Sequence, residues 1–382
     1  MKVLFTANPG FGHVHPMMPL AQALAARGHE VRWAVAPEAC GRIEAAGFAT
    51  FPAGIAGAER RAEFDRCLAG VQALPPDQRP ARMFPAFFGA VCTPPMLDDL
   101  LPVVDRWQPA LIVNDASELA APLAGELRGL PHATHAFGAL LPEDRVRAAG
   151  EAVAPLWQAH GLEPRPYAGS YDHLYLDIYP PSIRFGGYDH VAQVQPLRPV
   201  PYDAVGGDPW EPVVGGHRPL VYLTFGTVFN EPRLFAAAMA GVASLEVDVL
   251  VTVGPAAGPE ALGAVPPNVR VARYVPQTAV LPHCAAVASH AGSGTFLASL
   301  GLGIPQLCLP QAADQFINAR QGAASGAALT LAPGEATPDA IADAVGQLLE
   351  EPAFAGAARR LAAEIEAMPG PDEVAGALEG LV

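Results

Sequence analysis

The chain has 382 residues, and about half of them are hydrophobic, so it is long enough for two domains that each bury a core. Its formal net charge of −15 excludes a nucleic-acid or anionic-membrane surface, because both need clustered cations. Lys2 is the only lysine, which excludes Schiff-base, P-loop and Tyr-x-x-x-Lys mechanisms.

The cysteines and the N-terminus indicate where the protein works. Five cysteines without a CxxC spacing predict neither a disulfide framework nor a zinc site. The N-terminal apolar run is short and interrupted by glycine, so we expect neither a signal peptide nor a membrane span. A cytoplasmic location is therefore expected. With one lysine, any bound phosphate must be held by arginines, backbone amides and histidine.

The first half of the chain alternates strand and helix patterns, which predicts a parallel sheet with crossover helices. The expected strands are Val3–Ala7, 30–36, 48–54, 109–115, 131–137 and 173–184. The expected helices run from Pro16 to the cap Gly28 and over 42–47, 97–107, 116–129 and 143–161. Residues 55–95 break this rhythm, and we expect an aromatic loop segment there.

Residues 195–219 are rich in Pro and Gly, and they mark the expected boundary between two α/β domains. Beyond it we expect strands at 220–226, 247–254, 269–275, 285–289, 305–310 and 327–332, and helices at 231–244, 279–284, 294–303, 313–326, 338–351 and 354–368. The predicted domains are 1–205 and 206–368, with a final helix, 369–382, that crosses back to the first. Ligands of such sheets bind beyond the carboxyl ends of the strands, so two facing halves would form a cleft.

The stretch "VASHAGSGTF" ends one of these strands at His290 and starts a helix. Gly292 and Gly294 would allow a ligand close to the backbone, and the amides of Ser293, Gly294 and Thr295 would bind phosphate without lysine. A plain helix cap is the alternative. The spacing fits neither a G-x-S-x-G elbow around Ser293 nor a G-x-G-x-x-G loop.

Several pieces in order, "GHVHP", "LTFGT", "RYVPQTAVLPHC", "SHAGSGT" and "GIPQLCLPQAADQ", resemble the GT-B fold family 1 glycosyltransferases. They are most similar to the bacterial branch that glycosylates macrolides, enediynes and angucyclines from TDP- or UDP-sugars. The resemblance covers nearly the whole chain. It implies an α/β protein with two facing Rossmann-like domains, an N-terminal acceptor domain and a C-terminal donor domain.

The resemblance also implies a donor site. In the family, the corner histidine and the amides after it contact the diphosphate, here His290 with Gly292 to Thr295. Tyr274 and Val275 would lie near the nucleobase, with Gln277 beside them. Asp314 and Gln315 would contact sugar hydroxyls, although alone they would indicate a solvated helix start. Gly226 and Thr227 would approach the nucleotide from the other side.

The first loop holds the expected general base. Gly10 and Gly12 precede His15, where a dinucleotide loop would need a third glycine, and this weakens an oxidoreductase interpretation. The family places its base in an H-x-x-P motif, which His13 and Pro16 match, and pairs it with an aspartate at the position of Asp115. A carboxylate behind histidine fixes its tautomer and stabilises the imidazolium. Alone, His13 would be a loop residue and Asp115 a helix cap.

Phe84, Phe87, Phe88, His135 and Phe137, with Gly12 in the first loop, are the expected lining of an apolar acceptor pocket. The alternative is that the phenylalanines only cover the core. We expect an inverting transferase that needs no metal, with a nucleotide-sugar co-substrate and a polyketide-like or aromatic acceptor. A C-glycosyltransferase, a hydrolysing nucleotide-sugar epimerase and a silent helper protein remain alternatives. Sugar, aglycone and a homodimeric state stay open.

Overall fold

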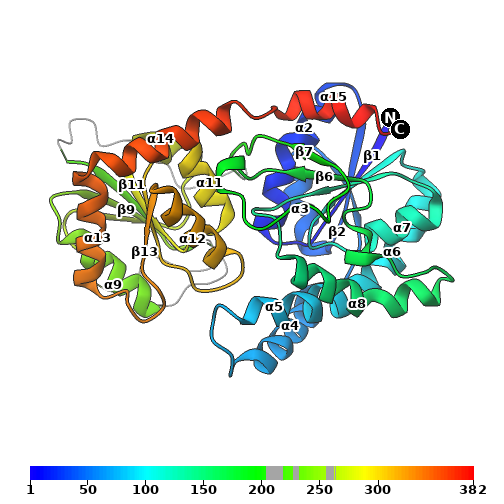
Figure 1. Ribbon diagram of the computed structural model, residues 1–382, viewed down its shortest axis with the longest axis horizontal. Coiled ribbons are helices and arrows are strands. Elements are labelled where there is room, and N and C mark those ends of the chain that lie inside the picture. Colours follow the sequence, from blue (N-terminus) through cyan, green and yellow to red (C-terminus); the bar gives the residue numbers. More distant parts are fainter. Residues whose placement is uncertain (204–217, 227–231, 255–261, 263) are drawn as a thin grey trace. The chain divides into compact units, whose positions relative to one another are not determined.

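The computed structural model describes residues 1–203, 218–226, 232–254, 262 and 264–382. The chain folds into two compact units (Figure 1). The first unit comprises Met1–Tyr179, Phe185–Arg198 and Pro369–Val382, and the second comprises Pro180–Arg184 and Pro199–Met368. The second unit's long segment thus starts at Pro199, earlier than the predicted 206. Asp203 is held in this unit, because its carboxylate accepts hydrogen bonds from the amides of Gln277 and Thr278.

The first unit contains a seven-stranded parallel sheet. Its order is β3 (Ala49–Pro52), β2 (Glu30–Val35), β1 (Lys2–Ala7), β4 (Leu111–Asp115), β5 (His132–His135), β6 (Leu174–Asp177) and β7 (Val194–Pro196). The order reverses between β1 and β4, which pair directly, with Thr6 opposite Asn114. Groups that follow β1 and end β4 therefore meet at one edge of the sheet, the usual ligand position in such folds.

Helical segments connect these strands. They are α1 (Phe11–Val14), η1 (His15–Met17), α2 (Met18–Ala26), α3 (Pro37–Ala45), α4 (Gly57–Val71), α5 (Arg79–Met83), η2 (Phe84–Cys92), α6 (Thr93–Trp107), α7 (Ala120–Arg128), α8 (Glu143–Ala159), η3 (Pro166–Gly169) and α15 (Pro371–Glu379).

The predicted aromatic loop segment is wrong, because residues 79–107 form one continuous helical stretch through a π-helical turn, η2. Pro85 and Pro94 lie within this stretch, in the first turns of η2 and α6, and neither can donate a helical hydrogen bond from its backbone nitrogen. Of the described residues, this is the one helix long and apolar enough to cross a membrane. Half of its most apolar window is buried within the protein, so its length alone is weak evidence for a span.

The last helix, α15, packs against α2 in the first unit, and Figure 1 shows the two chain ends together. Val374, Ala375 and Leu378 are its buried residues. Around them, Glu379 accepts hydrogen bonds from Arg27 Nε at 3.0 Å and His29 Nε2 at 2.8 Å. An apolar stripe with a charged border thus holds this segment to the first unit.

The second unit contains a six-stranded parallel sheet. Its order is β10 (Val269–Ala272), β9 (Asp248–Thr252), β8 (Leu220–Thr224), β11 (Cys284–Ser289), β12 (Gln306–Cys308) and β13 (Ala328–Thr330). Its helical segments are η4 (Pro181–Ile183), α9 (Pro232–Ala243), α10 (Gln277–Val280), η6 (Leu281–His283), α11 (Ser293–Gly301), α12 (Gln315–Ser325), α13 (Pro338–Glu350) and α14 (Pro352–Glu366).

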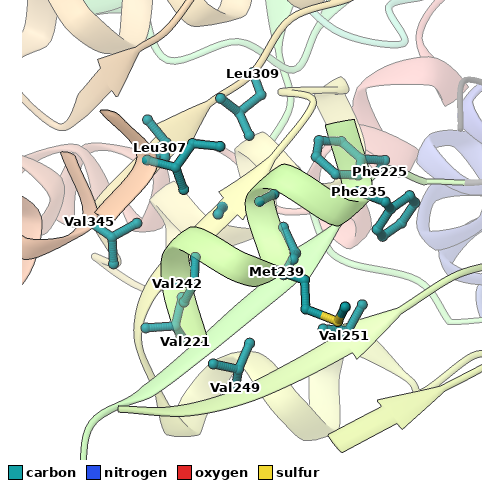
Figure 2. Close-up of a cluster of buried hydrophobic side chains, with 14 of the residues drawn as sticks. Val221, Phe225, Phe235, Met239, Val242, Val249, Val251, Leu307, Leu309 and Val345 are labelled. Atoms are coloured by element: carbon teal, nitrogen blue, oxygen red, sulfur yellow. The ribbon is translucent and has the colours of Figure 1, made fainter. Parts of the chain in front are cut away.

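Alternate residues of β8 serve two cores, as expected for a strand covered on both faces. Val221 packs into a cluster with Phe235 and Met239 of α9 and Val345 of α13, and Figure 2 shows these side chains together. Tyr222 packs into the opposite cluster, with residues of α10 and α11. The sheet is therefore held rigidly between two helical layers, and its loops project from a fixed edge.

Three histidines lie in environments that disfavour their charged form. Burial lowers the pKa of His132 to about 3, and it lowers those of His135 and His290 to about 4. All three are therefore neutral at pH 7.

Replacing Leu378 by Ala should release part of the α15 contact. The side chain is fully buried, so the free energy of unfolding of the first unit should fall by about 2–5 kcal/mol. Scanning calorimetry would measure this change. Leu302→Ala is the control, because Leu302 is 47% exposed and its truncation should have little effect. Equal effects of the two substitutions would contradict the packing described for α15.

The neutral histidines predict a loss of stability in mild acid. In the unfolded chain they bind protons below a pKa of about 6.5, whereas in the folded chain they do so only near 3 to 4. The unfolded state therefore binds more protons in this window, and stability should fall as pH is lowered from about 6.5 to 4. Urea unfolding midpoints would measure the slope. His132→Gln should reduce it, and an unchanged slope would show that His132 takes up its proton in the folded state.

Candidate active site

His13 and Asp115 meet at the edge of the first sheet. His13 lies in α1, the turn that follows β1, and Asp115 is the last residue of β4. His13 Nδ1 lies 3.0 Å from Asp115 Oδ2, and the two side chains are 21% and 0% exposed. The first loop, which the sequence predicted to be irregular, thus contains a helical turn that carries the imidazole to the carboxylate.

Asp115 keeps its charge although it is fully buried. Burial acts to raise the pKa of Asp115, but the charge and hydrogen bond of His13 and two hydrogen bonds from Ser117 outweigh it, so the net pKa lies below its ordinary value. The ionised carboxylate holds a proton on His13 Nδ1, because that nitrogen faces it. The other ring nitrogen, Nε2, is then the one with a lone pair for a substrate proton.

Ser117 and Asn8 complete this network, and the sequence analysis did not identify either. Ser117 Oγ donates to Asp115 Oδ2 at 2.6 Å and lies 3.1 Å from His13 Nδ1. Asn8 Nδ2 donates to Ser117 Oγ at 2.9 Å. The Asp-x-Ser spacing at 115–117 was the available signal for Ser117. The ring of His15, the second histidine that follows β1, lies edge-on to Phe11 at 5.0 Å between centroids.

Glu118 is a second buried carboxyl group close to Asp115. It accepts from Thr6 Oγ1 at 2.6 Å and from the amide of Ala120 at 2.6 Å, so it caps α7. Burial raises the pKa of Glu118 to about 7. With Asn8 and Ser117 it lines a pocket of about 20 Å³, enough for one water.

The predicted acceptor residues divide into two groups. Phe88 and Phe137 are partly exposed, and their ring centroids lie 5.6 and 5.0 Å from that of His13. Phe84, Phe87 and His135 are buried. The rings of Phe84 and Phe87 pack against that of Phe88. His135 Nδ1 donates to the carbonyl of Ala136 at 2.6 Å.

Gly12 is exposed in α1, and a Cβ added there would contact nothing. Of the predicted acceptor residues, Phe88 and Phe137 are thus the ones whose rings lie against His13.

In the second unit, His290 lies between two glycines. A Cβ at Gly226 would come within 2.9 Å of the ring, and one at Gly292 would lie 2.6 Å from Nε2, so both positions need glycine. His290 Nδ1 is buried and has no hydrogen-bond partner among the described residues. Because the ring is neutral at pH 7, it offers one N–H donor rather than a cation.

The turn after His290 leads into α11, whose first residues are Ser293, Gly294 and Thr295. The first helical hydrogen bond runs from the amide of Phe296 to the carbonyl of Gly292 at 3.0 Å. The three amides before it have no acceptor within the helix. They form a donor group at the positive end of the helix dipole, which suits an anion.

Asp314 and Gln315 lie at the start of α12 in different environments. Asp314 Oδ2 accepts from Ser293 Oγ at 2.5 Å, which links this loop to the start of α11. Gln315 is 2% exposed, and its Oε1 accepts from the amides of Gln311 and Ala312 at 2.8 and 2.9 Å. The Gln315 carbonyl is therefore engaged by its own loop. Asn318, buried beside Asp314, was not identified from sequence.

Tyr274 and Gln277 are joined by Asp203, which the sequence analysis also missed. Asp203 Oδ1 accepts from the amide of Gln277 at 2.8 Å and from the Tyr274 hydroxyl at 3.4 Å. Gln277 Nε2 donates to Thr295 Oγ1 at 2.8 Å, so this segment reaches the start of α11. The side chain of Val275 lies in the core. Thr227 lies outside the described residues.

In the described part of the chain, no group of three or more His, Cys, Asp or Glu side chains is arranged to hold a metal ion. Around His290, the second unit offers an anion the amides that open α11, hydroxyl groups and a neutral imidazole. The first offers an apolar surface beside a paired histidine. Together these are the groups that binding of an anionic donor and deprotonation of an acceptor require.

Comparison with known proteins agrees with this chemistry. Residues 236–381 match the C-terminal domain of the family described as erythromycin biosynthesis protein CIII-like. The chain is 34% identical to the elloramycin glycosyltransferase ElmGT of Streptomyces olivaceus, over 99% of this chain and 97% of the relative. It is 32% identical to the L-demethylnoviosyl transferase of Streptomyces niveus, over 100% and 97%.

Solved structures agree as well. The glycosyltransferase VinC in complex with dTDP has a TM-score of 0.80 and 28% identity, over 100% of this chain and 99% of that chain. The spinosyn rhamnosyltransferase SpnG complexed with thymidine diphosphate has a TM-score of 0.80 and 29% identity, over 99% and 100%. The chain therefore belongs to the GT-B natural-product glycosyltransferases of antibiotic biosynthesis.

Proposed function

We propose that this enzyme is an inverting transferase that moves a hexose or deoxyhexose from a TDP- or UDP-sugar to a hydroxyl of a hydrophobic aglycone. The observation that carries this proposal is the contact between His13 and the buried Asp115, at the ends of neighbouring strands. The names of the relatives support the substrate classes, since they include a daunosamine and a desosaminyl transferase. We also propose that the enzyme acts in the cytoplasm.

In the proposed reaction, His13 is the general base. Asp115 holds the proton on Nδ1, and Nε2 accepts the proton of the acceptor hydroxyl as its oxygen attacks the anomeric carbon. The bond from that carbon to the diphosphate oxygen breaks in the same step, and the nucleoside diphosphate leaves. A single displacement inverts the anomeric centre. The positive charge gained by His13 is stabilised by the Asp115 carboxylate at 3.0 Å.

In the second unit, the amides that open α11 are the proposed contacts of the donor diphosphate. His290 adds one N–H, and Asp314 is the proposed partner of a sugar hydroxyl. The support is that these amides lack helical acceptors and that His290 sits beside them between Gly226 and Gly292. We propose that the helix terminus, rather than a metal ion, offsets the charge of the leaving group.

For the acceptor, we propose that the exposed faces of Phe88 and Phe137 contact an aromatic or polyketide-like aglycone next to the base. Both rings lie within 6 Å of the His13 ring, centroid to centroid, and offset or edge-on contacts between rings are favourable at this range. We propose O-glycosylation, because the acceptor group that His13 would deprotonate is a hydroxyl.

Substitution of the base should abolish transfer. We expect His13→Ala and Asp115→Asn to lower kcat by about 10²–10⁴-fold, the usual contribution of general base catalysis, with little change in donor KM. Product formation from TDP- and UDP-hexoses with a panel of polyketide and phenolic aglycones would be measured by mass spectrometry. His15→Ala is the matched control and should retain activity. Full activity of His13→Ala would rule out its role, and free nucleotide without glycoside would favour a hydrolysing epimerase.

A methyl group at Gly292 should weaken donor binding. In Gly292→Ala the new Cβ would lie 2.6 Å from His290 Nε2, so the ring must leave its position. We expect the Kd for thymidine diphosphate, measured by calorimetry, to rise about tenfold, as for the loss of one charge-assisted hydrogen bond. Gly301→Ala, in the same helix, has only an ordinary contact at 3.8 Å and serves as control. Equal affinities of both variants would contradict the placement of His290.

A further inference from the structure

We propose that Asn318 is a positioning residue of the donor site, which ties the turn at Ala291 to Asp314 and so sets the direction of the amides that open α11. The inference rests on the proposed donor site. It concerns a side chain that does not itself reach the donor.

Asn318 joins two loops that follow neighbouring strands, β11 and β12. It is fully buried in the first turn of α12. Its Nδ2 lies 2.9 Å from the carbonyl oxygen of Ala291, 3.0 Å from Ser293 Oγ and 3.2 Å from Asp314 Oδ2. One amide group thus donates to acceptors on both loops. It fixes residues 291–293, which lead into α11, relative to Asp314, the proposed sugar contact.

The backbone at this junction is strained. Ala291 has φ +61° and Ala313 has φ +55°, a left-handed conformation that a residue with a Cβ rarely adopts. Such a conformation persists only where surrounding contacts impose it. Ala291 is held from both sides, since its amide donates to Ser289 Oγ at 3.0 Å and its carbonyl accepts from Asn318.

Loss of the Asn318 contact would therefore have a local consequence. The backbone of Ala291 would be free to relax toward a negative φ. This change would shift the residues that follow, Gly292 and Ser293. The amides of α11 would lose their common direction, and the His290 ring would lose the space that Gly292 leaves for it. Since pre-aligned donors bind an anion more strongly than donors that must reorient, donor affinity should fall.

The chain offers a matched control in the same unit. Asn268 Nδ2 also bridges two backbone carbonyls, those of Ala243 at the end of α9 and of Val247 before β9, both at 3.0 Å. Neither acceptor lies in the turn of residues 290–295 that leads into α11. Asn318→Leu and Asn268→Leu therefore remove the same type of interaction, and only the first should affect the donor.

The test compares three measurements in the full-length protein. We expect the Kd for thymidine diphosphate and the donor KM of Asn318→Leu to rise about tenfold, as for loss of one to two hydrogen bonds, with acceptor KM within twofold of wild type. Asn268→Leu should lower Tm without changing donor affinity. Hydrogen exchange in the ligand-free protein should accelerate at residues 291–295 in Asn318→Leu only. If Asn318→Leu does not fold, Asn318→Ser removes the same Nδ2 donor without placing an apolar side chain among polar groups.

A rescue variant separates positioning from a general loss of stability. In Ala291→Gly/Asn318→Leu, glycine adopts positive φ without strain, so donor affinity should recover at least partly while Tm stays low. Unchanged donor affinity and unchanged exchange at 291–295 in Asn318→Leu would overturn the inference, as would the absence of rescue. A wild-type protein that binds neither TDP nor UDP would instead overturn the proposed function, and the exchange result would still decide the role of Asn318.

Discussion

A charged carboxylate with no access to solvent is the constraint on which the first unit's site depends. Asp115 is fully buried at the end of β4, and it stays ionised only because His13 and Ser117 supply compensating contacts. Glu118 is buried to a similar degree but is bonded by neutral donors, the Thr6 hydroxyl and the amide of Ala120. Without a histidine partner, burial raises its pKa to about 7. The adjacency of β1 and β4 is therefore a condition for the proposed chemistry, since it brings the imidazole to the carboxylate.

The donor site proposed in the second unit would face the opposite requirement, because it would have to attract a negative charge. Its proposed solution is geometric. The start of α11 presents three amides, and His290 adds a neutral donor in a space that two glycines leave open. Neutral donors carry a smaller desolvation cost than buried cations, but they depend on correct direction. The contacts around Ala291 fit this dependence, because Ser289 and Asn318 both bond its backbone, and Ser293 bonds Asp314 beside it.

Sequence reasoning found most strands and the two-domain α/β class, because alternation of apolar runs with helical patterns depends on local residues. It failed where distant contacts decide the structure. The aromatic stretch 84–92 is helical because α8 packs against it, and that contact cannot be read from its prolines and glycines. Asp203 and Asn318 also escaped notice, since their partners lie 71 and 27 residues away in Tyr274 and Ala291. His13 and Asp115 were predicted because a motif and a strand end marked them, whereas nothing marked Asn8.

Position and protonation together decide what His13 in the first unit and His290 in the second can do. His13 is partly exposed and faces a carboxylate, so it can gain a proton without leaving its place. The His290 ring lies between Gly226 and Gly292, and its Nδ1 is buried. Burial lowers the pKa of His290 to about 4. A cation at His290 would bind diphosphate more strongly, yet it would also retain the leaving group and would pay a desolvation cost whenever the site is empty. A neutral imidazole avoids both penalties, which is consistent with a site that must release its product after each transfer.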